Sequence, residues 1–378
     1  MFHSSRPTFA EIELEALLHN LRQATRFCGP GQRILAVVKA NAYGHGAVAV
    51  SKALAAEGVE QFGVAILEEA LELRLAGINQ PILVFGGCFP GQEEAFLQQR
   101  LMPVVCDRQS LMRLNRFAYQ RDVRLPVHLK VDTGMGRAGF LLPEFRQLVP
   151  ELEALDGLSI VGLMSHLACA DEVEDDVTSS QVERFRGLIR EVRDQGLDIP
   201  ELHISNSAGL VGWDCPECTL VRPGIMLYGG MPGEKYRDRL DLKPVMHVRT
   251  HIAQLKSVPP GTGVSYGHRF HATRQTMLAL LPIGYADGYN RLLTNRGEVL
   301  IGGRRAPVVG TVCMDWIMID VTDIQQVAVG DPVTLLGEVD GLMISAEEWA
   351  EWLGTISYEI FCRIGARVPR YYPEAQSD

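Results

Sequence analysis

The sequence predicts an α/β fold joined to an all-β one: an N-terminal (β/α)8 barrel followed by a C-terminal β-rich domain. From about residue 34 to 228, eight short apolar runs alternate with charged segments of helical periodicity. Such alternation is typical of parallel strands covered by helices. Beyond about residue 243 the pattern changes to alternating, β-rich segments without long helices. We therefore place the barrel in residues 1–243 and the β domain in residues 244–378, although the first few residues could join the β domain.

The expected elements follow in chain order. The barrel strands are the apolar runs at residues 33–40, 62–67, 81–86, 102–106, 127–133, 160–166, 202–207 and 220–224. The clearest helices between them are expected at 68–77, 91–100, 109–121 and 178–196, where apolar residues recur at helical spacing. The β domain should hold strands within 245–258, 276–289, 298–321 and 331–341, then a short helix at 345–354. No solenoid repeat or low-complexity linker is visible, so we expect the two domains to pack closely.

Composition excludes several classes of function. The 378 residues carry a formal charge of -10, which argues against nucleic acid or an anionic membrane as the main partner. No apolar run spans a bilayer and the start lacks a secretory pattern, so we expect a cytoplasmic protein. The eight cysteines are scattered, which favours free thiols. Cys215 and Cys218 form a C-x-x-C, but no partner pair follows at zinc spacing, so we expect no metal.

Polar residues follow several of the apolar runs. Lys39 ends the first run, Arg137 follows the fifth and His166 closes the sixth. In a barrel the active site lies at the carboxyl ends of the strands. An enclosed lysine amine can lose its proton and bind a carbonyl cofactor covalently. The alternative for Lys39 alone is a strand-end lysine that reaches solvent.

The last two barrel strands indicate a phosphate site. SNSAG at 205–209 and RPGIMLYG at 222–229 offer hydroxyls and glycine-permitted backbone N–H groups. One such stretch is more often a turn, but two adjacent strand ends favour a phosphate cup. A reactive lysine beside a phosphate cup suggests pyridoxal phosphate, whose ring acts as an electron sink.

These motifs resemble those of the alanine racemases, pyridoxal-phosphate enzymes of fold type III. The resemblance runs in order from RPTFAEIELEAL near the N-terminus to RVPR near the C-terminus. The motifs that carry it are AVVKANAYGHG, KVDTGMGRAG, MSHLACAD, NSAG, VRPGIMLYG, VSYGHRF, LPIGYADGY and GTVCMD. The resemblance implies racemisation of L-alanine and D-alanine, which in bacteria supplies D-alanine for peptidoglycan.

The resemblance implies two catalytic bases, Lys39 and Tyr266. Removing the α-proton leaves a planar carbanion, and inverting the centre requires a second group to return a proton from the other face. Lys39 would serve the D-face and Tyr266 the L-face. In the family, residues matching His166 and Arg222 support the tyrosine, and a residue matching His203 orients the arginine. Such an arginine would face the pyridine nitrogen and keep it largely unprotonated.

Further residues match the family's binding groups. Those for the cofactor are Tyr43, Asn206, Ser207, Gly224, Ile225 and Tyr358, and those for the substrate are Arg137, Met314 and Tyr285, with Lys130 matching a lysine that is often carbamylated. An ordinary ion pair with an acid is the alternative for Lys130. Trp316 departs from the family, because many relatives carry a smaller or polar residue there.

The family resolves the distance between Lys39 and Tyr266 with a head-to-tail homodimer, in which the tyrosine reaches the neighbour's barrel. Three alternatives stay open. The first is a broader or serine-preferring racemase. The second is a barrel decarboxylase, which generally pairs the pyridine nitrogen with a carboxylate, so Arg222 counts against it. The third is a non-enzymatic carrier of pyridoxal phosphate, which would leave the β domain without a purpose.

Overall fold

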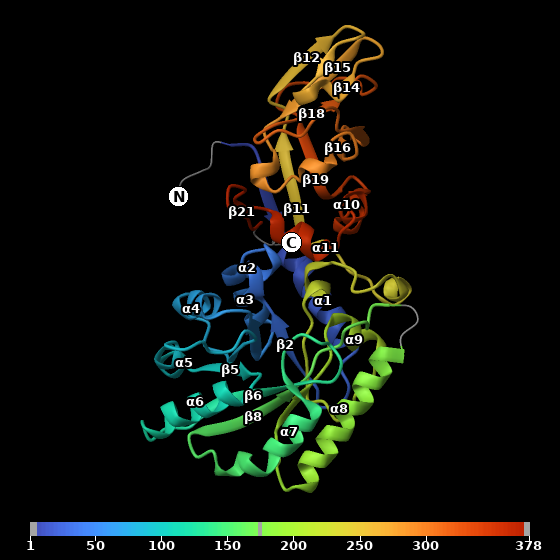
Figure 1. Cartoon of the computed structure of the whole chain (residues 1–378). Coiled ribbons are helices and arrows are strands. Elements are labelled where there is room, and N and C mark those ends of the chain that lie inside the picture. The colour runs from blue at the N-terminus through green and yellow to red at the C-terminus, as the bar shows by residue number, and fades with distance from the viewer. Residues whose placement is uncertain (1–5, 173–175, 374–378) are drawn as a thin grey trace.

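Eight parallel strands form a nearly closed barrel, as the sequence predicts. The computed structural model describes residues 6–172 and 176–373, and Figure 1 shows the barrel beneath the β-rich domain. The barrel strands are β2 (Arg33–Val37), β3 (Gln61–Val64), β4 (Ile82–Val84), β5 (Leu101–Val105), β6 (Leu125–Asp132), β8 (Leu158–Met164), β9 (Glu201–His203) and β10 (Leu220–Val221). β10 pairs with β2, and the ring is completed by Thr219 N donating to Leu202 O at 2.8 Å.

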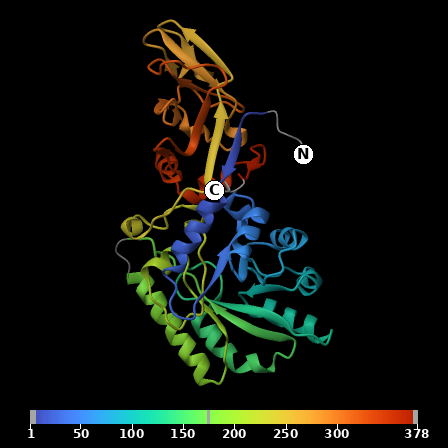
Figure 2. The same cartoon turned by 180° about the vertical axis from the view of Figure 1, so that it is seen from behind.

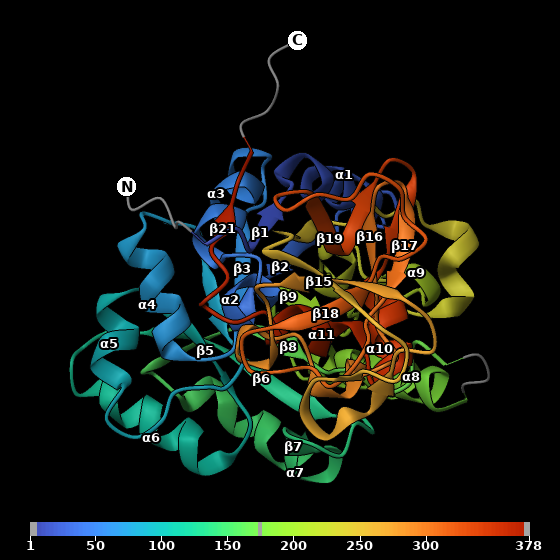
Figure 3. The same cartoon turned by 90° about the horizontal axis from the view of Figure 1, so that it is seen from above.

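Helices surround this ring, as the view from above shows (Figure 3). They are α3 (Ala47–Ala56), α4 (Leu67–Leu75), α5 (Glu93–Gln98), α6 (Arg108–Tyr119), α7 (Leu142–Leu148), α8 (Asp176–Asp194) and α9 (Ser207–Gly212). α6 shows why these segments are helical, since Asp107 caps its first turn and Leu111 and Leu114 lie on one buried face. A two-residue strand, β7 (Phe140–Leu141), pairs with β6 beside the ring.

The last strand is not followed by a covering α-helix, which differs from a strict strand and helix alternation. β10 leads into a 3-10 turn, η2 (Ile225–Tyr228), and α1 (Leu14–Thr25) from the chain start packs there instead. Asn20 of α1 donates its side-chain amide to Leu227 O at 3.2 Å and to Lys243 O at 2.8 Å. Two glycines after this turn rule out a long helix, so the covering helix comes from elsewhere in the sequence.

The second domain is rich in β-structure. Its main sheet contains β17 (Arg304–Pro307), β16 (Glu298–Ile301), β19 (Pro332–Val339), β11 (Met246–His251), β1 (Phe9–Ile12) and β21 (Arg370–Tyr371), with β20 (Leu342–Ile344) on β19. Smaller sheets contain β12 (Gln254–Val258), β15 (Thr276–Leu281) and β18 (Ile317–Asp320), and β13 (Gly263–Val264) with β14 (Phe270–His271). β1 lies antiparallel to β11 (Figure 2), so the chain start contributes to this sheet. The division after residue 243 itself stays a prediction.

Two short helices complete the second domain. α10 (Ala346–Leu353) is the expected helix, and the hydroxyl of Ser345 caps it by accepting from Glu348 N at 3.1 Å. α11 (Ser357–Arg363) lies in the tail for which the sequence predicts only mixed structure. In the part of the chain that the structure describes, no helix is long and apolar enough to cross a membrane.

The C-terminal tail ties the second domain to the barrel at α2 (Lys39–Tyr43). Four consecutive residues from Ala40 to Tyr43 have φ between 51° and 54°, so α2 is a left-handed turn. Arg370 donates from Nε to Gly44 O at 2.9 Å, and Tyr372 donates its hydroxyl to His45 O at 3.0 Å. Because left-handed turns of non-glycine residues cost roughly 1–2 kcal/mol per residue, contacts of this kind must hold the turn in place.

Gly44 should be intolerant of a side chain. Its φ is +81°, and a Cβ built on it would lie 2.3 Å from Phe361 O of α11. We expect Gly44→Ala to lower the free energy of unfolding by about 2 kcal/mol or more, because a clash with backbone adds to the strain of positive φ. Gly58→Ala is the matched control, since Gly58 has φ +95° with nothing within 4 Å of the added Cβ. Urea midpoints followed by circular dichroism make the comparison, and equal midpoints for the two variants would contradict it.

Candidate active site

One cavity of about 310 Å³ opens at the carboxyl end of the barrel strands and brings most of the expected site residues together. It is lined by Val37, Lys39, Tyr43, Phe85, Lys130, Arg137, Met164, His166, Asn206, Ser207, Arg222, Gly224, Ile225 and Tyr358. Four of these side chains are basic, and none of the described lining residues is acidic. The cavity is therefore suited to an anionic ligand.

Lys39 is held at this cavity by the left-handed turn that follows it. Glu69 of α4 accepts from Ala40 N at 2.6 Å and from Ala65 N at 2.7 Å, so one carboxylate links the ends of β2 and β3. The ring of His45 donates from Nδ1 to carbonyls of the same turn, at 3.0 Å from Ala42 O and 2.9 Å from Tyr43 O. Burial lowers the pKa of His45 to about 3, so the ring is neutral. These contacts fix the backbone beside Lys39.

The Lys39 amine loses its proton more readily than an exposed lysine does. Burial lowers its pKa, the positive charge of Arg137 lowers it further, and Glu69 opposes them. Lys130 is also buried, and burial again lowers its pKa. A deprotonated lysine amine is a better nucleophile and base than an ammonium group.

Arg137 is positioned by a carboxylate that does not pair with its charge. Asp132, at the end of β6, accepts from Gly134 N at 2.8 Å, Met135 N at 2.7 Å and Arg137 N at 3.2 Å. All three contacts are to backbone N–H groups, so they shape the loop that leads Arg137 to the cavity. The guanidinium keeps its charge for a ligand.

Neutral groups line another part of the cavity. Ser207 Oγ accepts from Gly224 N at 2.9 Å. A Cβ on Gly224 would lie 2.5 Å from the hydroxyl of Tyr43, so glycine lets these strand ends approach. The rings of Tyr43 and Tyr358 lie 5.9 Å apart, and Tyr358 comes from α11 of the second domain. Asn206 uses its side chain to accept from Gly209 N at 2.9 Å and caps α9.

Arg222 lies deep in the cavity and contacts both expected histidines. Its Nη1 lies 2.8 Å from His203 Nδ1, and its Nη2 lies 3.2 Å from His166 Nδ1. Because a guanidinium only donates, each of these ring nitrogens accepts. Burial, together with the charge of Arg222, holds the pKa of both histidines well below the ordinary value, so both are neutral. Burial also lowers the pKa of Arg222 to about 10.

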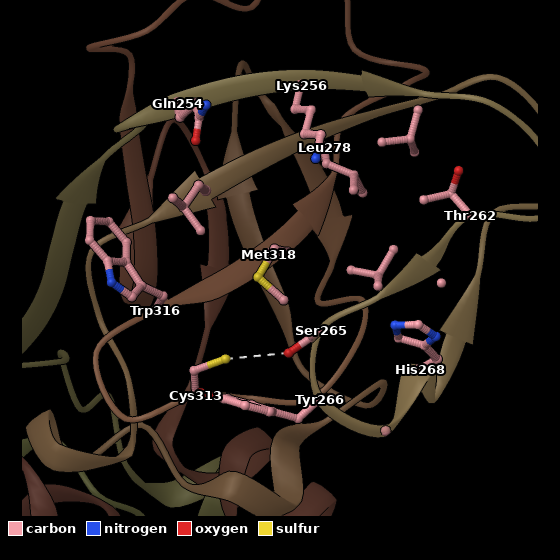
Figure 4. A pocket seen from close by; sticks show the side chains of 15 residues that line it. Gln254, Lys256, Thr262, Ser265, Tyr266, His268, Leu278, Cys313, Trp316 and Met318 are labelled. Carbon is pink, nitrogen blue, oxygen red and sulfur yellow. Dashed lines mark hydrogen bonds between the residues drawn. The ribbon is translucent and has the colours of Figure 1, made fainter.

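Apart from Tyr358, the expected residues of the second domain do not line this cavity. Tyr266, in η4 (Tyr266–His268), is 72% exposed and borders a separate groove of about 620 Å³ (Figure 4). Trp316 lines the same groove. Tyr285 and Met314 are also exposed and lie on two adjoining loops, where Tyr285 N donates to Cys313 O at 3.0 Å. Within one chain, the structure does not bring these residues to Lys39.

Sequence reasoning missed several residues that shape the site. Val37, Phe85 and Met164 line the cavity, and their places at or just after strand ends could have indicated them. Glu69 could have been noticed only as an acidic residue in a first helical turn. Among the residues that the structure describes, no cluster of three or more histidine, cysteine or acidic side chains could hold a metal ion.

Fold and cavity define a barrel protein with a half-buried lysine of lowered pKa in its cavity. Comparisons with known proteins are more specific. The family model of the alanine racemase N-terminal domain matches residues 12–232, and that of the C-terminal domain matches residues 245–372. The chain belongs to the alanine racemase family. It is 48% identical to the alanine racemase of Geobacter sulfurreducens and 46% identical to that of Halothermothrix orenii, with 97% of each chain covered in both comparisons.

Solved structures agree with this assignment. The alanine racemase of Streptomyces lavendulae superposes with a TM-score of 0.93 at 34% identity, covering 99% of this chain and 98% of that one. The Bacillus anthracis enzyme, solved with bound L-Ala-P, superposes with a TM-score of 0.92 at 34% identity, covering 98% and 96%. The family and the barrel-plus-β fold inferred from the sequence motifs are thus confirmed.

Arg137→Met should make Lys39 harder to deprotonate. Losing a neighbouring positive charge raises the pKa of the Lys39 amine, so more alkaline conditions are needed to modify it. The measurement is the pH dependence of amine acylation at Lys39, followed by peptide mass spectrometry on protein freed of small molecules. Lys52, exposed on α3, is the internal reference and should react alike in both proteins. A Lys39 profile that stays in place or moves to lower pH would contradict the electrostatic account.

Proposed function

We propose that this chain interconverts L-alanine and D-alanine with bound pyridoxal phosphate, using Lys39 as one of two catalytic bases. The observation that carries the proposal is the Lys39 cavity, where the Lys39 amine, three further basic side chains and a neutral hydroxyl-lined end converge without a described acidic residue. Membership of the alanine racemase family supports it. When bound, pyridoxal phosphate supplies an electron-withdrawing ring that lets the α-proton of an amino acid leave.

The residues present fit this cofactor. Tyr43, Ser207 and Tyr358 offer hydroxyls, and Gly224 and Ile225 offer backbone N–H groups, for a phosphate at the glycine-bearing end. The Gly224 N–H donates to Ser207 Oγ, so a phosphate would compete with that contact. Lys39 is the amine for the aldehyde. Arg222 is the donor for the pyridine nitrogen, with His203 behind it.

Racemisation needs a second base on the face of the substrate opposite Lys39. We assign Tyr266 to that role, on the L-face, with Lys39 on the D-face. A phenol must be helped to give up its proton near neutrality. Since His166 Nδ1 accepts from Arg222, His166 carries its proton on Nε2, which suits it to donate to a tyrosine oxygen at the cavity mouth.

Because Tyr266 lies outside the Lys39 cavity of its own chain, the proposal includes a homodimer with shared sites. The exposed groove around Tyr266 would then contact the barrel of the partner (Figure 4). Tyr285 and Met314, exposed on adjoining loops, would narrow the pocket and contact the substrate carboxylate. Arg137 would bind that carboxylate from the barrel side, and Lys130, if carbamylated, would orient Arg137.

The wider setting follows from the reaction. D-alanine made in this way would supply peptidoglycan synthesis, and we propose a cytoplasmic location. A decarboxylase fits less well, because no acidic group among the described lining residues could protonate the pyridine nitrogen. A serine-preferring or broader racemase is the nearest alternative, since its difference would lie in pocket size around Tyr285 and Met314.

Mixing two inactive variants tests the shared site. Lys39→Ala and Tyr266→Ala should each abolish racemisation, because each removes one base from both sites of the dimer. After unfolding and refolding of an equal mixture, half the dimers are hybrids with one intact site each, so about a quarter of the wild-type activity should return. Subunit exchange is verified with differently tagged chains. Recovered hybrids without activity would rule out sites built from two chains.

A panel of amino acids separates the candidate reactions. We expect α-proton exchange and inversion with alanine, at least about tenfold faster in kcat/KM than with serine, because one added hydroxyl changes both size and hydrogen bonding in the pocket. Circular dichroism follows inversion of alanine, serine, lysine and arginine, and carbon dioxide release reports decarboxylation. Faster turnover of serine would favour the broader racemase, and carbon dioxide release without inversion would overturn the proposed reaction.

A further inference from the structure

A chain of buried polar side chains crosses the barrel interior behind the cavity. Arg222 Nη1 lies 2.8 Å from His203 Nδ1, and His203 Nε2 lies 2.9 Å from His128 Nδ1. His128 Nε2 lies 3.2 Å from Glu201 Oε2 as a charge contact, and no hydrogen bond of that nitrogen is seen among the described residues. Both rings are fully buried. Of the four residues, only Arg222 lines the cavity.

The two ends of this chain set its direction. The guanidinium of Arg222 can only donate, and the ionised carboxylate of Glu201 can only accept. His203 Nδ1 must therefore accept, which places the ring proton on Nε2, where it points to His128 Nδ1. By the same reasoning His128 Nδ1 accepts and its Nε2 carries the proton toward Glu201. Arg222 then donates to His203, His203 donates to His128, and His128 Nε2–H faces the Glu201 carboxylate at 3.2 Å. In this arrangement both imidazoles are neutral Nε2–H tautomers.

The barrel interior is shaped around His128. A Cβ on Gly162 of β8 would lie 2.0 Å from His128 Nδ1, so glycine leaves the space that the imidazole occupies. The pairing of β6 with β8 shifts register between Val127 and His128, at the point where the ring enters. A buried imidazole accommodated by both a glycine and a strand irregularity is a built feature of the core.

Glu201 is placed to remain an anion at the far end. Its carboxylate lies 3.1 Å from Arg33 Nη2 and accepts from Gln61 Nε2 at 3.2 Å. Burial alone would raise its pKa, but the contacts with His128, Gln61 and Arg33 together hold the pKa below the ordinary value. Among the described residues, Arg222 hydrogen-bonds only to ring nitrogens and to two backbone carbonyls, Ser165 O and Ile204 O.

We propose that Glu201 and His128 are positioning residues for Arg222. The Glu201 carboxylate fixes the tautomers of His128 and His203, and these two rings hold the Arg222 guanidinium as a donor toward the bound ligand. The inference rests on the proposed function, which places the pyridine nitrogen of the cofactor opposite Arg222. His203 matches the family's orienting histidine, and the inference adds the ring of His128 and the carboxylate of Glu201 behind it. Without that end the two rings could reverse their tautomers, and His203 Nδ1–H would then oppose an Arg222 N–H.

Nitrogen NMR on the holoenzyme tests the chain directly. Protein labelled with 15N-histidine and loaded with pyridoxal phosphate should show His203 and His128 protonated at Nε2 only, with assignments taken from His128→Asn. In Glu201→Gln the Nε2 proton signals of both rings should shift or broaden, because the anionic acceptor is lost. The matched control is Glu217→Gln, which removes a similarly buried carboxylate paired with Arg186 at 2.8 Å. Rings protonated at Nδ1, or doubly protonated in the wild type, would overturn the proposal.

Kinetics separate positioning from a merely structural role. Glu201→Gln should lower kcat for alanine about tenfold with KM changed less than about threefold, the scale seen when outer partners of catalytic groups are removed. His128→Phe removes the acceptor for His203 and should lower kcat more than His128→Asn does, because the asparagine side-chain oxygen can still accept. Glu217→Gln should stay within about twofold of wild type. If Glu201→Gln behaves like Glu217→Gln in both kcat and NMR, the chain has no such role. Should the wild type not racemise alanine, the proposed function fails while the NMR result still judges the chain.

Discussion

Uncompensated positive charge at the end of the barrel is the constraint on which this structure depends. Lys39, Lys130, Arg137 and Arg222 line one cavity, and no acidic residue among the described lining meets them. Burying cations without partners is costly, and proteins relieve the cost by shifting pKa values or by binding an anion. Both lysines accordingly have lowered pKa values through burial, and His166 is neutral. Under the proposed function, the remaining relief would come from a ligand with anionic groups, whose binding would also stabilise the fold by mass action.

The carboxylates nearest to this cluster do not neutralise it. Glu69 accepts from the backbone N–H groups of Ala40 and Ala65, and Asp132 accepts from three N–H groups of the loop that ends at Arg137. Glu69 and Asp132 are thus used to fix backbone geometry, and among the described residues they form no ion pair with the basic side chains of the cavity. Such a division maintains both precise placement and electrostatic attraction, which are the two requirements of a preorganised site.

The sequence predicts the barrel because apolar strand runs and helical spacing are each visible within a single segment of the chain. It predicts Lys39, Arg137 and His166 because residues at strand ends are functional positions in barrels. It does not predict the left-handed turn at Ala40–Tyr43, since no glycine marks it and its stability comes from Glu69 and Arg370. Tyr358 reaches the cavity from α11 of the other domain, so the family resemblance indicates it while strand-end position does not. His128 and Glu201 read as ordinary strand residues, because their chemistry appears only when β6 and β9 are brought together.

The two proposed bases lie apart within one chain, and this separation links the reaction to the assembly of the protein. One chain presents Lys39 in a cavity and Tyr266 at the surface, where Tyr266 is 72% exposed. The hydroxyl of Thr311, from another loop, donates to Tyr266 O. An enclosed amine can deliver a proton to one face of a planar intermediate, and inversion requires a donor on the other face. An exposed tyrosine whose backbone carbonyl accepts from Thr311 suits a site completed by association. The two-base reaction and the homodimer are therefore a single proposal, because neither base alone accounts for racemisation.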